Sequence, residues 1–83
     1  MKLTKSQKRY LLLLKNGNLF RVDEDAKTVR IRGYDLRIQY NTFSKFLAKG
    51  LISHAVKFYR SEQPKIRYYT ISEDGVNLLE ASF

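Results

Sequence analysis

The strongest constraint on the fold is an alternation of apolar and charged residues in two short runs between positions 19 and 32. Such alternation is typical of strands with one buried face, because successive side chains of a strand point to opposite sides. The turn-like segment DEDAK separates the two runs. Pairing Asp23 with Thr28 leaves a four-residue loop and sets Val22 opposite Val29. The sequence therefore predicts an antiparallel hairpin with one apolar face and one charged face.

The charged face of this hairpin has an unfavourable arrangement. The same register sets Arg21 directly opposite Arg30, with Arg32 further along the same face. Like charges directly across a ladder destabilise it. Two interpretations remain open: the arginines hold phosphate groups, or their side chains splay into water or reach the acids at the hairpin tip.

Two helices are predicted from their end signals. Thr4 and Gln7 form a capping box, and the helix that follows should end at Asn16, with Gly17 beyond it. A second helix should span Asn41–Lys49, with Phe43, Phe46 and Leu47 on its apolar face. The opposite face of this second helix carries short polar and basic residues.

A second hairpin and a final helix complete the predicted fold. Two β-rich runs, 51–59 and 65–71, flank RSEQPK, and pairing Arg60 with Lys65 fixes their register. The inward cross-strand pairs are then Val56 with Tyr69 and His54 with Ile71. Ser72 should cap the final helix, and Gly75 should lie where a side chain would collide with a neighbouring element. We expect one α+β domain, residues 1–83, in the order α-β-β-α-β-β-α.

Charge and composition indicate the class of partner. Sixteen Lys and Arg residues against eight Asp and Glu give a net charge of +8. The cations gather in residues 1–22 and 26–60, and the C-terminal part is mildly acidic. This asymmetry favours a polyanion, with nucleic acid ahead of an anionic membrane surface. The plain alternative is a small basic protein whose charge serves solubility alone.

The same composition argues against other classes of function. There is no cysteine, one histidine and few acids, so we expect no metal, no cofactor and no enzyme activity. The acids at 23–25 form a run that is usually a solvated turn. The longest apolar run, Leu11–Leu14, is too short for a membrane span, which predicts a cytoplasmic protein without a membrane partner.

Three segments resemble winged helix-turn-helix proteins of bacteria. LTKSQKRYLLLL is similar to their first helix, FSKFLAKGLI to the helix and strand before the wing, and YTISEDGVNLL to the end of the wing. The segments occur in the family's order and leave out residues 18–38. The resemblance implies a winged-helix-like domain and a DNA-binding regulator of transcription, similar to small phage and mobile-element proteins, with RNA as the alternative ligand.

The resemblance also implies contact residues. In this family the helix before the wing enters the major groove and the wing touches phosphates or the minor groove. Carried over to this chain, the helix contacts are Asn41, Ser44, Lys45 and Lys49, and the wing contacts are Lys57, Arg60, Lys65 and Arg67.

One departure from the family leaves the contact surface open. The helix that should precede the recognition helix is missing, since the first hairpin occupies its place and Gly33–Gln39 is too strand-like. The basic hairpin face, Arg21, Arg30 and Arg32, is therefore the alternative contact surface.

The alternative function is a protein-interaction or dimerisation module on the same scaffold, without DNA binding. Its surface would use Leu12 or Leu13 together with aromatic residues of the second hairpin. These aromatics are Phe58, Tyr59, Tyr68 and Tyr69.

Overall fold

Three helices and five strands form an α+β fold in residues 2–34, 36–55 and 66–83, the part of the chain that the computed structural model describes. The elements are α1 (Lys5–Lys15), β1 (Phe20–Asp23), β2 (Thr28–Ile31), β3 (Arg37–Ile38), α2 (Tyr40–Ala48), β4 (Ile52–His54), β5 (Ile66–Ile71) and α3 (Glu73–Ala81). None of these helices is long and apolar enough to cross a membrane.

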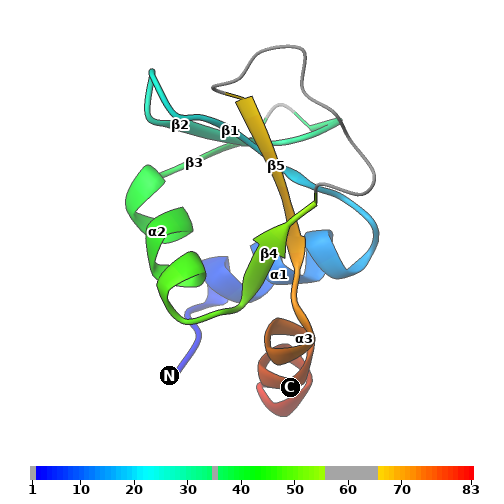
Figure 1. Cartoon of the computed structure of the whole chain (residues 1–83). Coiled ribbons are helices and arrows are strands. Elements are labelled where there is room, and N and C mark those ends of the chain that lie inside the picture. Colours follow the sequence, from blue (N-terminus) through cyan, green and yellow to red (C-terminus); the bar gives the residue numbers. More distant parts are fainter. Residues whose placement is uncertain (1, 35, 56–65) are drawn as a thin grey trace.

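The strands form one antiparallel sheet in the order β3-β2-β1-β5-β4 (Figure 1). The first hairpin has the predicted register, with Val22 opposite Val29 and Arg21 opposite Arg30. β5 lies beside β1, where Phe20 pairs with Tyr69. This long-range pairing joins the two hairpins into a single sheet, and the sequence pattern did not predict it.

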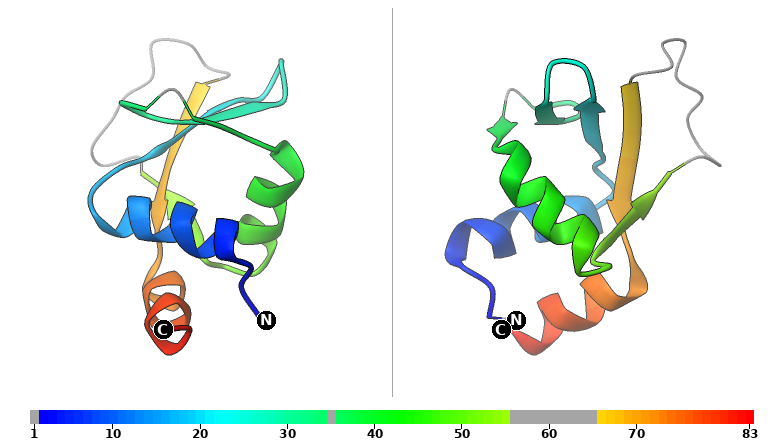
Figure 2. Two further views of the ribbon diagram at one scale, coloured as in Figure 1. Left: turned by 180° about the vertical axis from the view of Figure 1, so that it is seen from behind. Right: turned by 60° about the vertical axis from the view of Figure 1, so that its left-hand side comes forward.

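The core lies between one face of this sheet and the helices α1 and α2 (Figure 2). Phe46 of α2 stacks on Phe20 of β1 with 6.3 Å between ring centroids, and Phe43 meets Tyr69 edge to face at 4.9 Å. Edge-to-face and offset ring pairs add to the stabilisation from apolar burial. α2 is thus fixed to the sheet through its two buried phenylalanines, while α3 packs against α1.

The helix ends confirm the local predictions. Thr4 and Gln7 exchange both hydrogen bonds of the capping box, at 3.2 and 2.9 Å. The Ser72 hydroxyl accepts from the Gly75 amide at 3.1 Å and donates to the Gly50 carbonyl at 2.5 Å. A Cβ added at Gly75 would overlap the carbonyl oxygen of Leu51. Gly75 is therefore required because α3 starts in direct contact with the chain before β4.

Two predictions about the order and register of strands were wrong. The order α-β-β-α-β-β-α lacks β3, a strand of two residues that pairs with β2. In the second hairpin His54 pairs with Tyr69 rather than with Ile71, a shift of two residues. A shift of two keeps every side chain on its predicted face. His54 is nevertheless exposed at the end of β4, and Val56 lies outside the described residues.

Candidate nucleic-acid interface

Three arginines form a straight row across the outer face of the sheet. Arg21 of β1 stands opposite Arg30 of β2, and Arg30 stands opposite Arg37 of β3. We call Arg21, Arg30 and Arg37 the arginine row. All three side chains are exposed. Neighbouring strands lie about 4.8 Å apart, so the row presents three cations at short, regular intervals.

The alternation of the strands produces this row. Val22, Val29 and Ile38 are next to the three arginines in sequence and are 0%, 0% and 2% exposed. Burying these three side chains in the core turns the arginines to the other side, because successive residues of a strand point to opposite faces. The three cations therefore lie together on the solvent face because three aliphatic side chains are buried on the core face.

No carboxylate in residues 2–34, 36–55 or 66–83 forms an ion pair with the arginine row. The ion pair that these residues do contain is between Lys15 and Glu80, at 3.2 Å. The acids nearest in sequence have other partners: Asp23 accepts from the amides of its own loop, and Glu24 accepts from the Tyr40 hydroxyl at 3.1 Å. Asp23 and Glu24 are both half-buried, so this part of the acidic run is more than a solvated turn.

An aromatic side chain continues the row on the next strand. Tyr68 of β5 stands opposite Arg21 and is half-buried. The guanidinium carbon of Arg32 lies 6.0 Å from the centre of the Tyr68 ring, within the range of a cation–π contact. The outer face of the sheet therefore combines an aromatic ring at one end with a line of guanidinium groups.

At the β3 edge the row meets a polar hollow. Arg37 also lines a hollow of about 370 Å³ between the starts of α1 and α2. The other lining residues are Thr4, Ser6, Gln7, Tyr10, Gln39 and Thr42. All six carry hydroxyl or amide groups, so a polar ligand can follow the row around the edge of the sheet.

The predicted recognition face of α2 points elsewhere. Asn41, Lys45 and Lys49 are exposed and Ser44 is half-buried, on the side of α2 opposite its buried phenylalanines. α2 covers the core face of the sheet (Figure 2). The arginine row lies on the outer face, because its cross-strand register sets it opposite to the buried aliphatic side chains. The helix and the hairpin, which are the two alternative contact surfaces predicted from the sequence, thus lie on opposite sides of the core.

The predicted wing contacts are divided. Lys57, Arg60 and Lys65 lie outside the described residues. Arg67 is exposed and stands opposite the buried Val22, so it starts from the core side of the sheet rather than from the arginine row. The residue that the sequence analysis missed is Arg37, although its position between Leu36 and Ile38 already carried the alternation signal.

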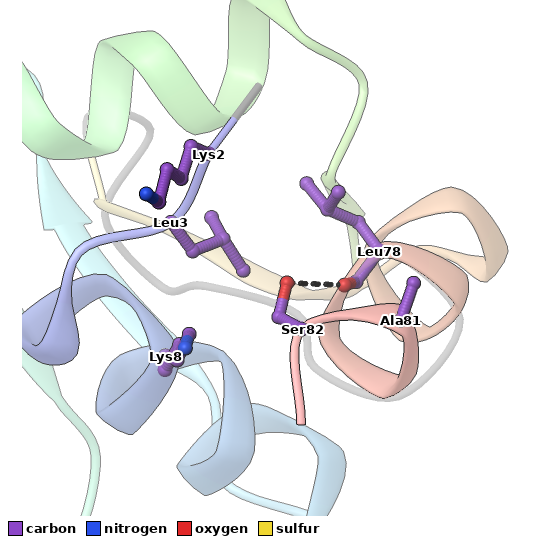
Figure 3. Close-up of a pocket in the computed structure, with 6 residues that line it drawn as sticks. All are labelled: Lys2, Leu3, Lys8, Leu78, Ala81 and Ser82. Atoms are coloured by element: carbon purple, nitrogen blue, oxygen red, sulfur yellow. Dashed lines mark hydrogen bonds between the residues drawn. The ribbon is translucent and has the colours of Figure 1, made fainter.

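A second hollow lies at the other end of the molecule, between the N-terminal segment, α1 and α3 (Figure 3). Its volume is about 530 Å³. The lining residues are Lys2, Leu3, Lys8, Leu78, Ala81 and Ser82, and the Ser82 hydroxyl donates to the Leu78 carbonyl at 2.7 Å. This lining contains no carboxylate, thiol or imidazole that could act as an acid, a base or a metal ligand. In the described part of the chain, no three His, Cys, Asp or Glu side chains are placed so that they could hold a metal ion.

Searches of protein-family models, of curated proteins and of solved structures each found no significant match to this chain.

Proposed function

We propose that this protein binds nucleic acid and that the arginine row is its phosphate-binding surface. The observation that carries the proposal is the alignment of Arg21, Arg30 and Arg37 on three adjacent strands, without an ion pair from the described residues. Such an alignment costs stability in the free protein. A polyphosphate lying along the row removes that repulsion when it binds.

Guanidinium groups suit this ligand. The planar fork of arginine donates two parallel hydrogen bonds to a phosphate and keeps its charge at all physiological pH values. Each neutralised phosphate releases condensed counterions, which supplies the driving force for binding. Contacts of this kind fix position and orientation and carry no sequence preference by themselves.

The test is a salt titration of binding to a fluorescent oligonucleotide. The wild-type affinity should fall steeply with salt, with a log–log slope of about −0.7 to −0.9 for each phosphate neutralised. The triple variant Arg21→Gln/Arg30→Gln/Arg37→Gln should bind more weakly, and its log–log slope should be smaller by up to about 2 to 3 units. The matched control removes three cations from α1: Lys5→Gln/Lys8→Gln/Arg9→Gln. Equal losses in the two variants would show that binding depends on total charge and not on the row.

A narrower proposal follows from the winged-helix resemblance: a transcription regulator that binds duplex DNA by inserting α2 into the major groove. The exposed side chains of Asn41, Lys45 and Lys49 support it, since amides and amines can donate to base edges. The variant Asn41→Ala/Lys45→Gln/Lys49→Gln separates the two surfaces. A larger loss of duplex affinity in this variant than in the arginine-row variant would assign binding to α2.

The alternative of a protein-interaction module is supported by exposed apolar side chains. Leu12 is 40% exposed and Phe83 is 80% exposed, whereas Leu13 packs against the core and Tyr69 is buried. Light scattering coupled to size exclusion, with and without oligonucleotide, distinguishes the functions. This alternative would be supported by a dimer whose measured mass does not change when nucleic acid is added. The Leu12→Glu variant should then be a monomer.

A further inference from the structure

We infer that the ligand of the arginine row is a single-stranded polynucleotide, lying across the strands with one unpaired base stacked on Tyr68. This inference rests on the proposed function and specifies its ligand. Tyr68, Arg21, Arg30 and Arg37 stand in one line over β5, β1, β2 and β3. The line therefore offers one aromatic surface followed by three phosphate-binding groups.

The width of the sheet argues against insertion into a duplex. The four strands of the line span about 14 Å between their axes at a spacing of about 4.8 Å. The major groove is about 12 Å wide and admits a helix or a two-stranded ribbon. β1 and β2 are flanked by β5 on one side and β3 on the other, so they cannot enter a groove as a free ribbon. Against a duplex this face can contact phosphates and no base edges.

The aromatic ring in the line favours a ligand with an unpaired base, which can stack on it. In a duplex the faces of the bases are covered by their neighbours, whereas in a single strand a base can leave the stack and lie on an aromatic side chain. Tyr68 is half-buried, so its surroundings hold the side chain while part of the residue remains exposed to solvent. The guanidinium carbon of Arg32 lies over the ring, 6.0 Å from its centre. A base that stacks on this side of the ring displaces the guanidinium group, which can then stack on the base or pair with its phosphate.

The direction of the ligand follows from the order of the groups. A strand with a base on Tyr68 passes Arg21 first, then Arg30, and leaves over Arg37 at the β3 edge. The polar hollow beside Arg37 provides hydroxyl and amide groups for the next nucleotide. Neither a deoxyribose nor a ribose is selected by these contacts, so both single-stranded DNA and RNA fit them.

The experiment compares three fluorescein-labelled probes at one salt concentration: oligo-dT and oligo-rU of about ten nucleotides, and a duplex of similar phosphate number. Anisotropy should show tighter binding of the single strands than of the duplex. Tyr68→Leu should weaken single-strand binding about 5- to 150-fold, which is the range for losing one stacked base, and should leave duplex binding unchanged. Tyr68→Phe should retain the wild-type affinity, and Phe83→Ala on the far side of the molecule is the control.

A second measurement does not depend on Tyr68→Leu being folded. The chain contains no tryptophan, so Tyr68→Trp introduces a single fluorophore of that kind at the stacking position. Single-stranded probes should quench its emission strongly, and the duplex should not. A difference between oligo-dT and oligo-rU in either assay would identify which sugar the natural ligand carries.

Two results overturn the inference in distinguishable ways. If the duplex binds as tightly as the single strands, depends on the arginine row and ignores Tyr68, the proposed function stands and the single-strand assignment fails. If no probe binds in a manner that depends on the row, both fail together.

Discussion

The hydroxyl group of Tyr40, the first residue of α2, donates a hydrogen bond to the Glu24 carboxylate at the tip of the first hairpin, over 3.1 Å. The Lys27 ammonium group lies 5.0 Å from the centre of the same ring. These two contacts tie the hairpin tip to the helix that anchors the core. The hairpin that carries Arg21 and Arg30 is therefore fixed at its tip by α2, in addition to its pairing within the sheet.

Removal of the Tyr40 hydroxyl should loosen this connection. Tyr40→Phe keeps the ring and its contact with Phe43 and loses the hydrogen bond to a charged acceptor. Because the bond is partly buried, we expect a loss of about 1 kcal/mol in the free energy of unfolding, measured by urea denaturation. In a double-mutant cycle, the effects of Tyr40→Phe and Glu24→Gln on the free energy of unfolding should not add, because both substitutions alter the same hydrogen bond.

The matched control is Tyr34→Phe, in a turn where the ring is 52% exposed. This control should leave stability unchanged. Equal stability of Tyr34→Phe and Tyr40→Phe would show that the Glu24 bond contributes nothing to the fold.

The hydroxyl group of Ser72 joins three parts of the chain. It caps α3 through the Gly75 amide and donates to the Gly50 carbonyl at the end of the α2 segment. Ser72→Ala should cost about 1–2 kcal/mol in unfolding free energy. Ser72→Asp keeps an acceptor for the Gly75 amide but cannot donate to Gly50, so its unfolding midpoint should lie between those of wild type and Ser72→Ala. An intermediate value is the check that both bonds contribute.

Gly75 of α3 leaves no room for a side chain. A methyl group there meets the Leu51 carbonyl, a backbone atom that cannot rotate away, and also the side chain of Ile71. Gly75→Ala should therefore lower the unfolding free energy by about 3 kcal/mol, although alanine is the better helix former. Asn77→Ala, exposed on the same helix, is the control and should be neutral or slightly stabilising. Thermal unfolding followed by circular dichroism would separate the two variants by several degrees.

Local patterns in the sequence were sufficient for local structure. The capping box at Thr4 and the register of Val22 against Val29 each depend on residues a few positions apart. Propensity and side-chain period carry that information directly. These predictions were confirmed for that reason.

The same reasoning could not predict which strands pair when they are far apart in the sequence. Nothing in the pattern of β1 distinguishes β5 from any other half-buried strand as its neighbour, so the single sheet was not predicted. Leu36, Ile38 and Tyr40 alternate with polar residues, but this pattern does not indicate β2 as the neighbouring strand, so Arg37 was not placed beside Arg30. The candidate site depends on both pairings. Two of the three residues of the arginine row, Arg21 and Arg30, follow from the hairpin register, whereas Arg37 and Tyr68 lie beside them through the pairing of β3 and β5.

At the centre of the arginine row, Arg30 should favour ligand binding but lower the stability of the free protein. Arg30 faces a cation on either side, Arg21 on β1 and Arg37 on β3. Arg30→Gln removes both like-charge contacts and should raise the free energy of unfolding by about 0.5–1 kcal/mol in low salt. The gain should shrink in high salt, where the Debye length falls to about 3 Å at 1 M and exposed charges are screened.

Arg67→Gln is the control for this change, because Arg67 is also exposed but stands opposite Val22 rather than opposite a cation. The free energy of unfolding of Arg67→Gln should not rise in low salt or in high salt. The same two proteins, titrated with oligonucleotide, should rank in the reverse order, with Arg30→Gln the weaker binder. A protein that becomes more stable while it loses its ligand has a charge cluster that serves binding and not folding. If Arg30→Gln is destabilised in low salt instead, the row is held by favourable contacts, and the physical basis for assigning it to phosphates is removed.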